Sequence, residues 1–243
     1  MPKAGIITQA RMTSTRLPGK VLFTAQGKTV LEHHLSRLAW SNIPVYVATT
    51  TNASDQPIVS LAEELGKPLF RGDEHNVLQR FYQCAVHFKL DVIIRVTSDC
   101  PLIDGSIIAD AMRQYEDLHD EQAYCSNALQ RTFPRGLDFE IFSFELLTQA
   151  YNNATDQSDL EHVTPYIHQN RTKSVHISHF TAAEDQSDLR WTLDTEADWK
   201  LIKELIETYD AAALRYREIL EIVRQHPELK AMNLHVKQRE IKL

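Results

Sequence analysis

A group of cations near the start of the chain is the first feature that could do chemistry. Arg11, Arg16 and Lys20 fall within the stretch 9–20, which also holds Ser14 and a Pro-Gly pair. Arginine can bind phosphate oxygens with two parallel hydrogen bonds, lysine supplies a point charge, and hydroxyls and backbone N–H groups can complete a cradle. This composition predicts a loop that binds triphosphate. A solvated basic loop is the alternative that the residues alone leave open.

Two better-known phosphate loops do not fit the sequence. The dinucleotide-binding fingerprint needs the pattern GxGxxG after the first strand, where Gly5 stands alone. The run 26–29 imitates the end of a P-loop, but Leu22 occupies the position of that loop's first glycine. A triphosphate site in this chain would therefore depend on arginine and lysine rather than on a glycine-rich backbone.

Two acidic residues follow extended, apolar runs. Asp99 comes after the run 92–96, and Asp194 comes after a second run much later in the chain. Two carboxylates from separate strand ends that converge on one ion are typical of Mg²⁺ sites in phosphoryl transfer. The alternative for each is a helix N-cap or a turn, and spacing alone does not decide between the two. Asp104 is predicted to lie in a turn that leads into a helix.

A further acidic pair stands in the stretch 135–140. If this stretch is a strand, alternation places Asp138 and Glu140 on one face. Their carboxylates could then accept hydrogen bonds from sugar hydroxyls. A solvent-facing strand edge is the alternative.

The elements that must position these residues follow from the hydrophobic pattern. The runs 4–7, 45–49 and 92–96 are short, β-branched and almost continuously apolar, as is typical of strands buried on both faces. Helical spacing of apolar residues lies between them at 30–38 and 58–65. This alternation predicts βαβ units and a parallel sheet, and ligands bind such sheets beyond the carboxyl ends of the strands.

The pattern changes in the second half of the chain. From about 123 to 180 strand-like runs at 137–142 and 174–178 surround a helical segment at 144–151. Two amphipathic helices are expected afterwards, at 196–208 and 212–225, the second stopped by Pro227. We predict a single α/β domain over 1–243 with an inserted lobe at about 125–182 and C-terminal helices at about 196–225.

Composition narrows the classes of function. The 243 residues are 43% apolar and 24% charged, with a net charge of −7, which argues against a general nucleic-acid binder. No run approaches 18 consecutive apolar residues, and the start carries no apolar leader. Three cysteines without a CxxC pair predict neither a disulfide framework nor a zinc site. We expect a cytoplasmic protein that binds neither nucleic acid nor membrane.

With these residues in place, the sequence resembles a known family. The stretch 9–20 is similar to the opening loop of the CMP-sugar synthetases, the cytidylyltransferases that activate 3-deoxy-2-keto sugar acids such as KDO and acylneuraminate. The sequence resembles more closely the branch of the spore-coat polysaccharide protein F, over about residues 4–210. The segments that carry this resemblance are 70–78, 95–104, 133–138, 161–166 and 189–195. One departure from the KDO enzymes is that their Gln-Gly-Asp-Glu-Pro loop is Thr-Ser-Asp-Cys-Pro at 97–101.

The resemblance implies a fold and an activity. The fold would be that of nucleotide-diphospho-sugar transferases, a GT-A or Rossmann-like mixed sheet flanked by helices, usually in a homodimer built through the lobe around 130–180. The activity would be Mg²⁺-dependent transfer of CMP from CTP to an acidic sugar, with release of pyrophosphate. Two alternatives stay open: a sugar 1-phosphate or a non-sugar acid as the acceptor, or a non-catalytic protein that binds a nucleotide sugar.

The resemblance also implies roles for individual residues. Lys20, Arg11 and Asp99 would be catalytic, and Asp99 and Asp194 would hold Mg²⁺. The acceptor would contact Arg135, Asp138 and Glu140. The nucleotide would be bound by Ala10, Arg11, Ser14, Arg16, Lys20, Arg71, Thr97 and Ser98.

Overall fold

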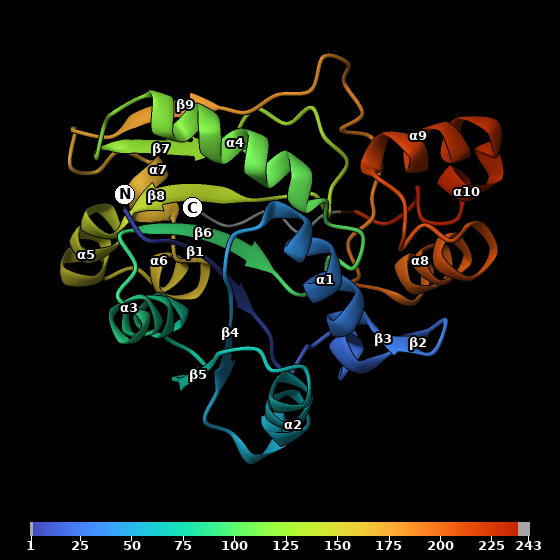
Figure 1. The fold of residues 1–243 in the computed structure, drawn as a ribbon, viewed down its shortest axis with the longest axis horizontal. Coiled ribbons are helices and arrows are strands. Elements are labelled where there is room, and N and C mark those ends of the chain that lie inside the picture. Colours follow the sequence, from blue (N-terminus) through green and yellow to red (C-terminus); the bar gives the residue numbers. More distant parts are fainter. Residues whose placement is uncertain (1, 238–243) are drawn as a thin grey trace.

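The computed structural model describes residues 2–237, and their core is a seven-stranded sheet (Figure 1). Its centre consists of the strands β1 (Ala4–Gln9), β4 (Val45–Thr50) and β6 (Val92–Thr97), which confirms the three predicted strands. Strand β5 (Leu69–Gly72) extends the parallel part, so that the order begins β5-β4-β1-β6. Gln9 pairs with Ala48 on one side and with Thr97 on the other, and the three strands therefore end at the same height.

The sheet continues beyond β6 with strands from the segment predicted as an inserted lobe. Strand β8 (Glu140–Ser143) pairs antiparallel with β6, β7 (Ala123–Ser126) pairs antiparallel with β8, and β9 (His176–His179) lies parallel to β7. The backbone groups along β6 need partners, and β8 supplies them. The strands thus form one mixed sheet in an α/β fold, as predicted. The segment was also predicted to leave the sheet, and this is true only of the helices between β8 and β9, because the strands of the segment belong to the sheet.

Helices cover both faces of this sheet (Figure 1). Ile6 points into a core shared with α1, α2, α4, α8 and α9, while its neighbour Ile7 points into a core shared with α3, α5 and α7. This alternation explains why the strand sequence is continuously apolar. The helices are α1 (Val30–Leu38), α2 (Gln56–Glu64), α3 (Val77–Phe88), α4 (Gly105–Asp117), α5 (Phe144–Asn153), α6 (Gln157–His162), α7 (Pro165–His168), α8 (Glu196–Tyr209), α9 (Tyr216–Gln225) and α10 (Pro227–Ala231).

Shorter elements complete the fold. A two-stranded hairpin of β2 (Thr24–Ala25) and β3 (Lys28–Thr29) precedes α1, and three 3-10 turns lie at Lys20–Leu22, Ala39–Ser41 and Ala53–Asp55. Thr29 begins α1 with a capping box, in which its side chain accepts from the backbone of Glu32 and the Glu32 carboxylate accepts from the backbone of Thr29.

The C-terminal helices differ from the prediction in their bounds. The expected helix at 212–225 begins only at Tyr216, where the Glu218 carboxylate accepts from the backbone N–H of the N-cap residue Arg215 at 2.7 Å. Pro227 does stop this helix, but it also opens α10, since proline fits the first turn, where its missing N–H has no helical partner. Among residues 2–237 no helix has both the length and the apolar character needed to cross a membrane.

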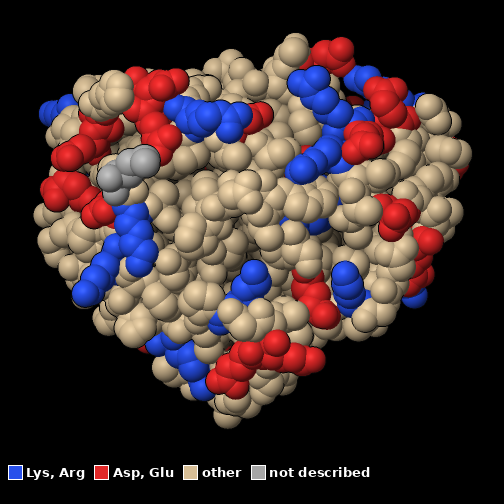
Figure 2. All heavy atoms as spheres, in the orientation of Figure 1, with Lys and Arg blue, Asp and Glu red and all other residues tan. Residues whose placement is uncertain are grey.

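Asp104 and Arg37 tie the C-terminal helices to the loop after β6. Asp104 caps α4, as predicted, and its other oxygen accepts a hydrogen bond from the backbone of Tyr216 at 2.8 Å. The buried guanidinium of Arg37 donates to five backbone carbonyls, those of Leu102, Ile103, Ala211, Ala212 and Leu214. These bonds fix the segment that follows Asp99. On the face shown in Figure 2, acidic and basic side chains are interspersed.

Candidate active site

A cavity of about 930 Å³ lies beyond the carboxyl ends of β1 and β6, where the fold class predicts a ligand site. Its lining brings together most of the residues that the sequence singled out. These are Ala10, Arg11, Ser14, Arg16, Lys20, Thr97, Ser98, Asp99, Arg135, Asp138 and Asp194. Within residues 2–237, the lining includes neither Arg71 nor Glu140.

The loop 9–20 is folded back on itself at its base. The backbone N–H of Gly19 donates to Met12 at 3.0 Å, and the N–H of Met12 is held by the Asp55 carboxylate at 2.8 Å. Gly19 has a φ of 68°, a conformation that side chains with a Cβ rarely adopt, which explains glycine after the proline. At the rim of the loop, Arg11 lies 3.8 Å from Glu74. The loop therefore has a fixed shape, with its cations on the cavity side.

Lys20 connects this loop to both predicted metal-binding carboxylates. Its Nζ atom lies 2.8 Å from Asp99 Oδ2 and 2.9 Å from Asp194 Oδ1, and it also donates to the backbone oxygen of Leu193 at 2.6 Å. Burial lowers the pKa of Lys20, but the two carboxylates outweigh burial and raise it above its ordinary value. The ammonium is therefore held in its charged form between the two acids.

The same electrostatics keeps Asp99 ionised. Burial raises the pKa of this carboxyl group, yet the charge and hydrogen bond of Lys20 lower it to about 2. Asp99 lies in the turn after β6. It does not cap a helix, and its carboxylate is paired with Lys20.

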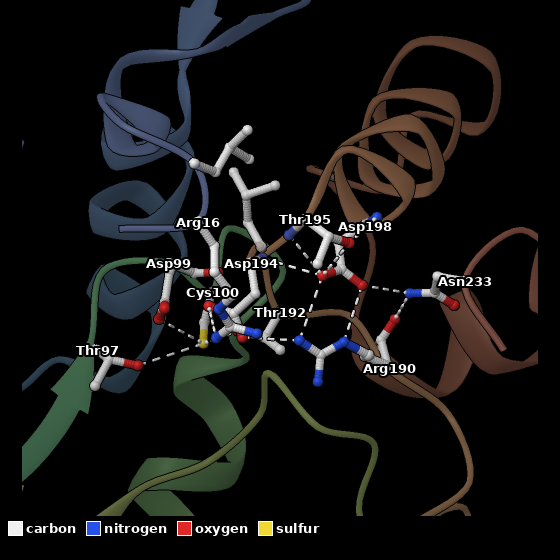
Figure 3. A network of polar contacts seen from close by, with 12 residues as sticks. Arg16, Thr97, Asp99, Cys100, Arg190, Thr192, Asp194, Thr195, Asp198 and Asn233 are labelled. Atoms are coloured by element: carbon white, nitrogen blue, oxygen red, sulfur yellow. Dashed lines mark hydrogen bonds and ion pairs between the residues drawn. The ribbon is translucent and has the colours of Figure 1, made fainter. Parts of the chain in front are cut away.

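Asp194 is surrounded by cations. Arg16 lies 2.9 Å from its Oδ1 atom, and Arg190 lies 2.7 Å from its Oδ2 atom (Figure 3). The N-cap of α8 is Thr195, which excludes the alternative that Asp194 caps the helix. Both carboxylates thus project toward the cavity, as the metal-binding prediction requires.

Asp99 and Asp194 are the side chains that could bind a divalent cation at this site. Asp99 and Asp194 come from separate segments and approach one point, since an oxygen of each lies within 2.9 Å of the same nitrogen of Lys20. Mg²⁺ is usually held by one or two carboxylates together with substrate phosphates and water. The described residues contain no cluster of three or more His, Cys, Asp or Glu side chains arranged for a metal. The pair therefore fits a cation that shares its ligands with a phosphate, and not an all-protein cage.

A buried histidine supports the turn that carries Asp99. Burial lowers the pKa of His34 to about 4, so its ring is neutral. Nδ1 must carry the proton, because it is 2.9 Å from the carbonyl oxygen of Cys100, which can only accept. Nε2 then accepts from Thr8, and the Thr8 oxygen accepts from Ser98, each at 2.8 Å. This chain of hydrogen bonds fixes the cavity-lining Ser98 and the turn after it.

Cys100 lines the cavity beside Asp99. Burial and the neighbouring Asp99 carboxylate raise the pKa of its thiol well above the usual value. A thiol in this environment stays protonated and is a poor nucleophile.

Two of the three residues predicted to contact the acceptor line the cavity. These are Arg135 and Asp138. Gly136 between them has a φ of 100°, and a Cβ there would lie 2.6 Å from the backbone of Trp191. Glu140 instead lies on β8, where its carboxylate accepts hydrogen bonds from Arg95, from Tyr124 and from Thr164.

This geometry corrects the expectation for the 135–140 stretch. Asp138 precedes the strand, which begins only at Glu140, so strand alternation does not place the two carboxylates together. Glu140 binds Arg95, and it is Arg95 that reaches the cavity.

Arg71 is also placed differently from the prediction. Its guanidinium donates to the backbone oxygens of Thr50 at 2.9 Å and of Asn52 at 3.0 Å. These carbonyls belong to the end of β4 and the segment after it, so Arg71 supports the adjoining turn.

Several cavity residues were missed by reasoning from the sequence. Arg80 on α3 and Arg95 on β6 contribute guanidinium groups, and α6 contributes Gln157, Ser158, Glu161 and His162. Arg95 did carry a signal, as the charged residue of an otherwise apolar strand. The buried Nε atoms of Arg80 and Arg95 and the Ser158 hydroxyl have no hydrogen-bond partner in the part of the chain that is described.

The segment after His162 holds a strained backbone. Val163 has φ 73° and ψ −51°, and the N–H of Thr164 donates to the carbonyl of His162 at 2.8 Å. This is a classic γ-turn, which is rare for a β-branched residue. Thr164 in turn donates to Glu140, so one buried carboxylate holds both Arg95 and the turn behind His162.

Comparisons with known proteins show which chains this one is similar to. The family model described as Cytidylyltransferase matches residues 5–237. The spore coat polysaccharide biosynthesis protein SpsF of Bacillus subtilis is 30% identical over 235 residues, which cover 91% of this chain and 94% of that protein. A 3-deoxy-manno-octulosonate cytidylyltransferase of Mesorhizobium japonicum is 32% identical over 117 residues, 46% of this chain and 48% of that one. A solved structure of a cytidylyltransferase from Leptospira borgpetersenii superposes with a TM-score of 0.91 at 31% identity, covering 99% of this chain and 100% of that one.

Proposed function

Because this chain belongs to the cytidylyltransferase family, we propose that it transfers CMP from CTP to an acidic sugar of the 3-deoxy-2-keto type, with release of pyrophosphate. One observation carries the proposal: Lys20 lies between Asp99 and Asp194 at the base of a loop that holds two further cations. A triphosphate needs this combination of charges. The match to a 3-deoxy-manno-octulosonate cytidylyltransferase over 46% of the chain supports the class of acceptor.

In the proposed complex the triphosphate lies along the loop 9–20. Arg11 and Arg16 bind phosphate oxygens, and the hydroxyl of Ser14 and backbone N–H groups complete the contacts. Lys20 neutralises charge on the departing pyrophosphate. Thr97 and Ser98, at the end of β6, line the same cavity beside Asp99.

Asp99 and Asp194 are the residues that would hold Mg²⁺. When bound, the ion would supply Lewis-acid neutralisation of charge at the reacting phosphate. Lys20 keeps Asp99 ionised, and Arg16, Lys20 and Arg190 hold the Asp194 carboxylate in place.

The transfer itself is a direct displacement. A hydroxyl oxygen of the acceptor forms a bond to the α-phosphorus of CTP, and the bond from that phosphorus to the oxygen bridging to the β-phosphate breaks. The electron pair of that bond leaves with pyrophosphate, and the hydroxyl proton passes to water. Arg and Lys side chains stabilise the charge that develops. Cys100 forms no covalent intermediate, since its thiol stays protonated.

The acceptor would occupy the part of the cavity away from the loop 9–20. Arg135 and Asp138 line one side, and Arg95 and His162 add a cation and an imidazole.

We further propose that the enzyme works in the cytoplasm as a homodimer built through the segment around 130–180. The three cysteines are free and buried, as suits a reducing compartment. Strand β9 is an edge of the sheet, and its Ile177 is exposed, which leaves backbone groups available for pairing. Light scattering on the purified protein tests the dimer, and a monomer at micromolar concentration would contradict it.

The decisive experiment measures pyrophosphate release from each nucleoside triphosphate with a panel of keto-sugar acids, sugar 1-phosphates and simple keto acids. Asp99→Asn and Asp194→Asn are assayed across a range of Mg²⁺ concentrations. Both should lose turnover by at least about 100-fold, while Asp110→Asn, an exposed residue of α4, should behave as the wild type.

Each other outcome has a meaning. Unchanged rates and metal dependence in both variants would show that the metal assignment is wrong. Turnover only with a sugar 1-phosphate or a non-sugar acid would replace the proposed acceptor. CTP binding without turnover on the whole panel would favour a non-catalytic nucleotide-binding protein.

A further inference from the structure

A network of buried polar residues reaches from the active site to the C-terminal segment (Figure 3). It runs from Asp194 through Arg190 and Asp198 to Asn233. We propose that Arg190 is a positioning residue for Asp194, and that Asn233 locks Arg190, so that the C-terminal segment sets the affinity of the active site for its divalent cation. This inference rests on the metal-binding role proposed above for Asp194.

The first step concerns the two oxygens of Asp194. Oδ1 lies toward the cavity, at 2.9 Å from both Lys20 and Arg16. Oδ2 accepts from Nη2 of Arg190 at 2.7 Å. The terminal torsion of an aspartate is broad, so a carboxylate without such a bond can rotate. With Oδ2 held, Oδ1 presents its lone pairs in one direction.

The second step concerns how Arg190 is itself held. Its Nε donates to Asp198 Oδ1 at 2.9 Å, and its Nη2 lies 3.3 Å from Asp198 Oδ2. Asp198 is completely buried. Burial raises the pKa of this carboxyl group, but hydrogen bonds from Arg190 and Asn233 lower it below its ordinary value. A planar guanidinium between two carboxylates has little freedom to turn.

Asp198 also holds the main chain at Asp194. Its Oδ2 atom accepts from the backbone N–H of Asp194 at 3.1 Å and from that of Thr195 at 2.9 Å. One carboxylate therefore fixes the backbone of Asp194 directly and its side chain through Arg190.

The third step brings in the C-terminal segment. Asn233, two residues beyond α10, is buried, and its Nδ2 donates to the backbone oxygen of Arg190 and to Asp198 Oδ1, each at 2.9 Å. The amide thus spans both partners of the ion pair. Outer-sphere contacts of this kind around a metal ligand typically change metal affinity or activity by about 10–100-fold when they are removed.

A purely structural ion pair is the competing explanation, and the two differ in what a variant changes. Asn233→Ala removes the lock without touching a charge. Arg190→Lys keeps the charge but cannot bridge Asp194 and Asp198 with a planar fork. Asn152→Ala on α5 and Arg224→Lys on α9, both exposed, are the matched controls.

The test measures Mn²⁺ bound to the protein in the presence of CTP and without acceptor, by the relaxation of water protons, together with the melting temperature. We expect about a tenfold weaker Mn²⁺ affinity for Asn233→Ala and a larger loss for Arg190→Lys. The KM for CTP at saturating metal should stay within about twofold, and excess Mn²⁺ should restore much of the turnover.

Variants that melt at a lower temperature but bind Mn²⁺ as tightly as the wild type would overturn the inference. If Asn233→Ala does not fold, Arg190→Lys decides by the same criterion. A wild-type protein that binds no Mn²⁺ with CTP would instead refute the proposed metal site, so the two failures are distinguishable.

Discussion

Lys20 and Asp99 are 79 residues apart in the chain, and the ammonium of the first lies 2.8 Å from the carboxylate of the second. The contact joins the loop 9–20 to the turn after β6. Under the proposed function, one side chain therefore serves both nucleotide binding and the geometry of the two acids.

Replacing Lys20 by methionine should therefore affect both. The variant lacks the charge that stabilises the leaving pyrophosphate, and we expect kcat to fall by at least about 100-fold. Without Lys20, Asp99 and Asp194 repel one another, so the pKa of Asp99 should rise from its value of about 2. Steady-state pyrophosphate release measures the first effect. Lys28→Met, at an exposed position of β3, is the control, and equal activity of the two variants would contradict the assignment.

Glu140 should affect the binding of the acceptor substrate without contacting that substrate. The variant Glu140→Gln keeps the shape of the side chain and one oxygen that can accept from the Thr164 hydroxyl, but it removes the charge that holds Arg95. We expect the KM for the acceptor to rise about tenfold, the size of one lost charge-assisted hydrogen bond. The KM for CTP should change little. A rise in both KM values together would instead indicate a general loss of structure.

Alanine substitutions at Gly136 and Gly27 allow the effect of backbone strain to be measured separately from the effect of a steric clash. Gly136→Ala must adopt a φ of 100° and place its Cβ 2.6 Å from the backbone of Trp191, close to Asp194. Gly27→Ala must adopt a φ of 74° but meets nothing within 4 Å. Urea denaturation should show a loss of about 1–2 kcal/mol for Gly27→Ala and of about 3 kcal/mol or more for Gly136→Ala. Only Gly136→Ala should lose activity, and an active Gly136→Ala enzyme would show that the Trp191 segment can move freely.

His34 predicts a pH dependence of stability. Burial lowers its pKa from 6.5 to about 4, so the unfolded chain takes up a proton at a higher pH than the folded one. Stability should be constant above pH 6.5 and should fall as the pH drops from 6.5 to 4, by about 3 kcal/mol for this group. Urea titrations at pH 7.5, 5.5 and 4.5 on the wild type and on His34→Gln measure it. A variant with the same slope as the wild type over this window would rule out His34 as the cause.

The central strands and the position of the loop 9–20 at the cavity could be predicted from the sequence, for physical reasons. A strand buried on both faces is apolar at most of its positions, so β1, β4 and β6 are recognisable in the sequence without any partner. The residues that follow such strands lie at the ligand-binding edge of the sheet, which is why Arg11, Lys20 and Asp99 were found.

Other features of the site depend on tertiary contacts that cannot be read from the spacing of residues in the sequence. The pairing of β8 with β6 joins residues such as Arg95 and Glu140, 45 positions apart, and decides that Arg95 and not Glu140 faces the cavity. Arg80 and the residues of α6 come to the site only through the packing of helices. The role of Arg190 depends on Asn233, 43 residues later.

The register of β1 and β6 has a consequence for how this site can change. Main-chain hydrogen bonds align Gln9 with Thr97, so the loop 9–20 and the Asp99 turn leave the sheet side by side whatever the side chains around them are. Asp194 belongs to no strand, and its segment meets the turn through the N–H of Leu193 on the carbonyl of Asp99 at 2.8 Å. Of the two acids proposed to hold the metal, Asp99 is thus fixed by the backbone of the sheet, whereas Asp194 can be adjusted by substitution at 190, 198 and 233. Altered metal preference should therefore arise more readily from changes near the C-terminus than from changes in the loop 9–20.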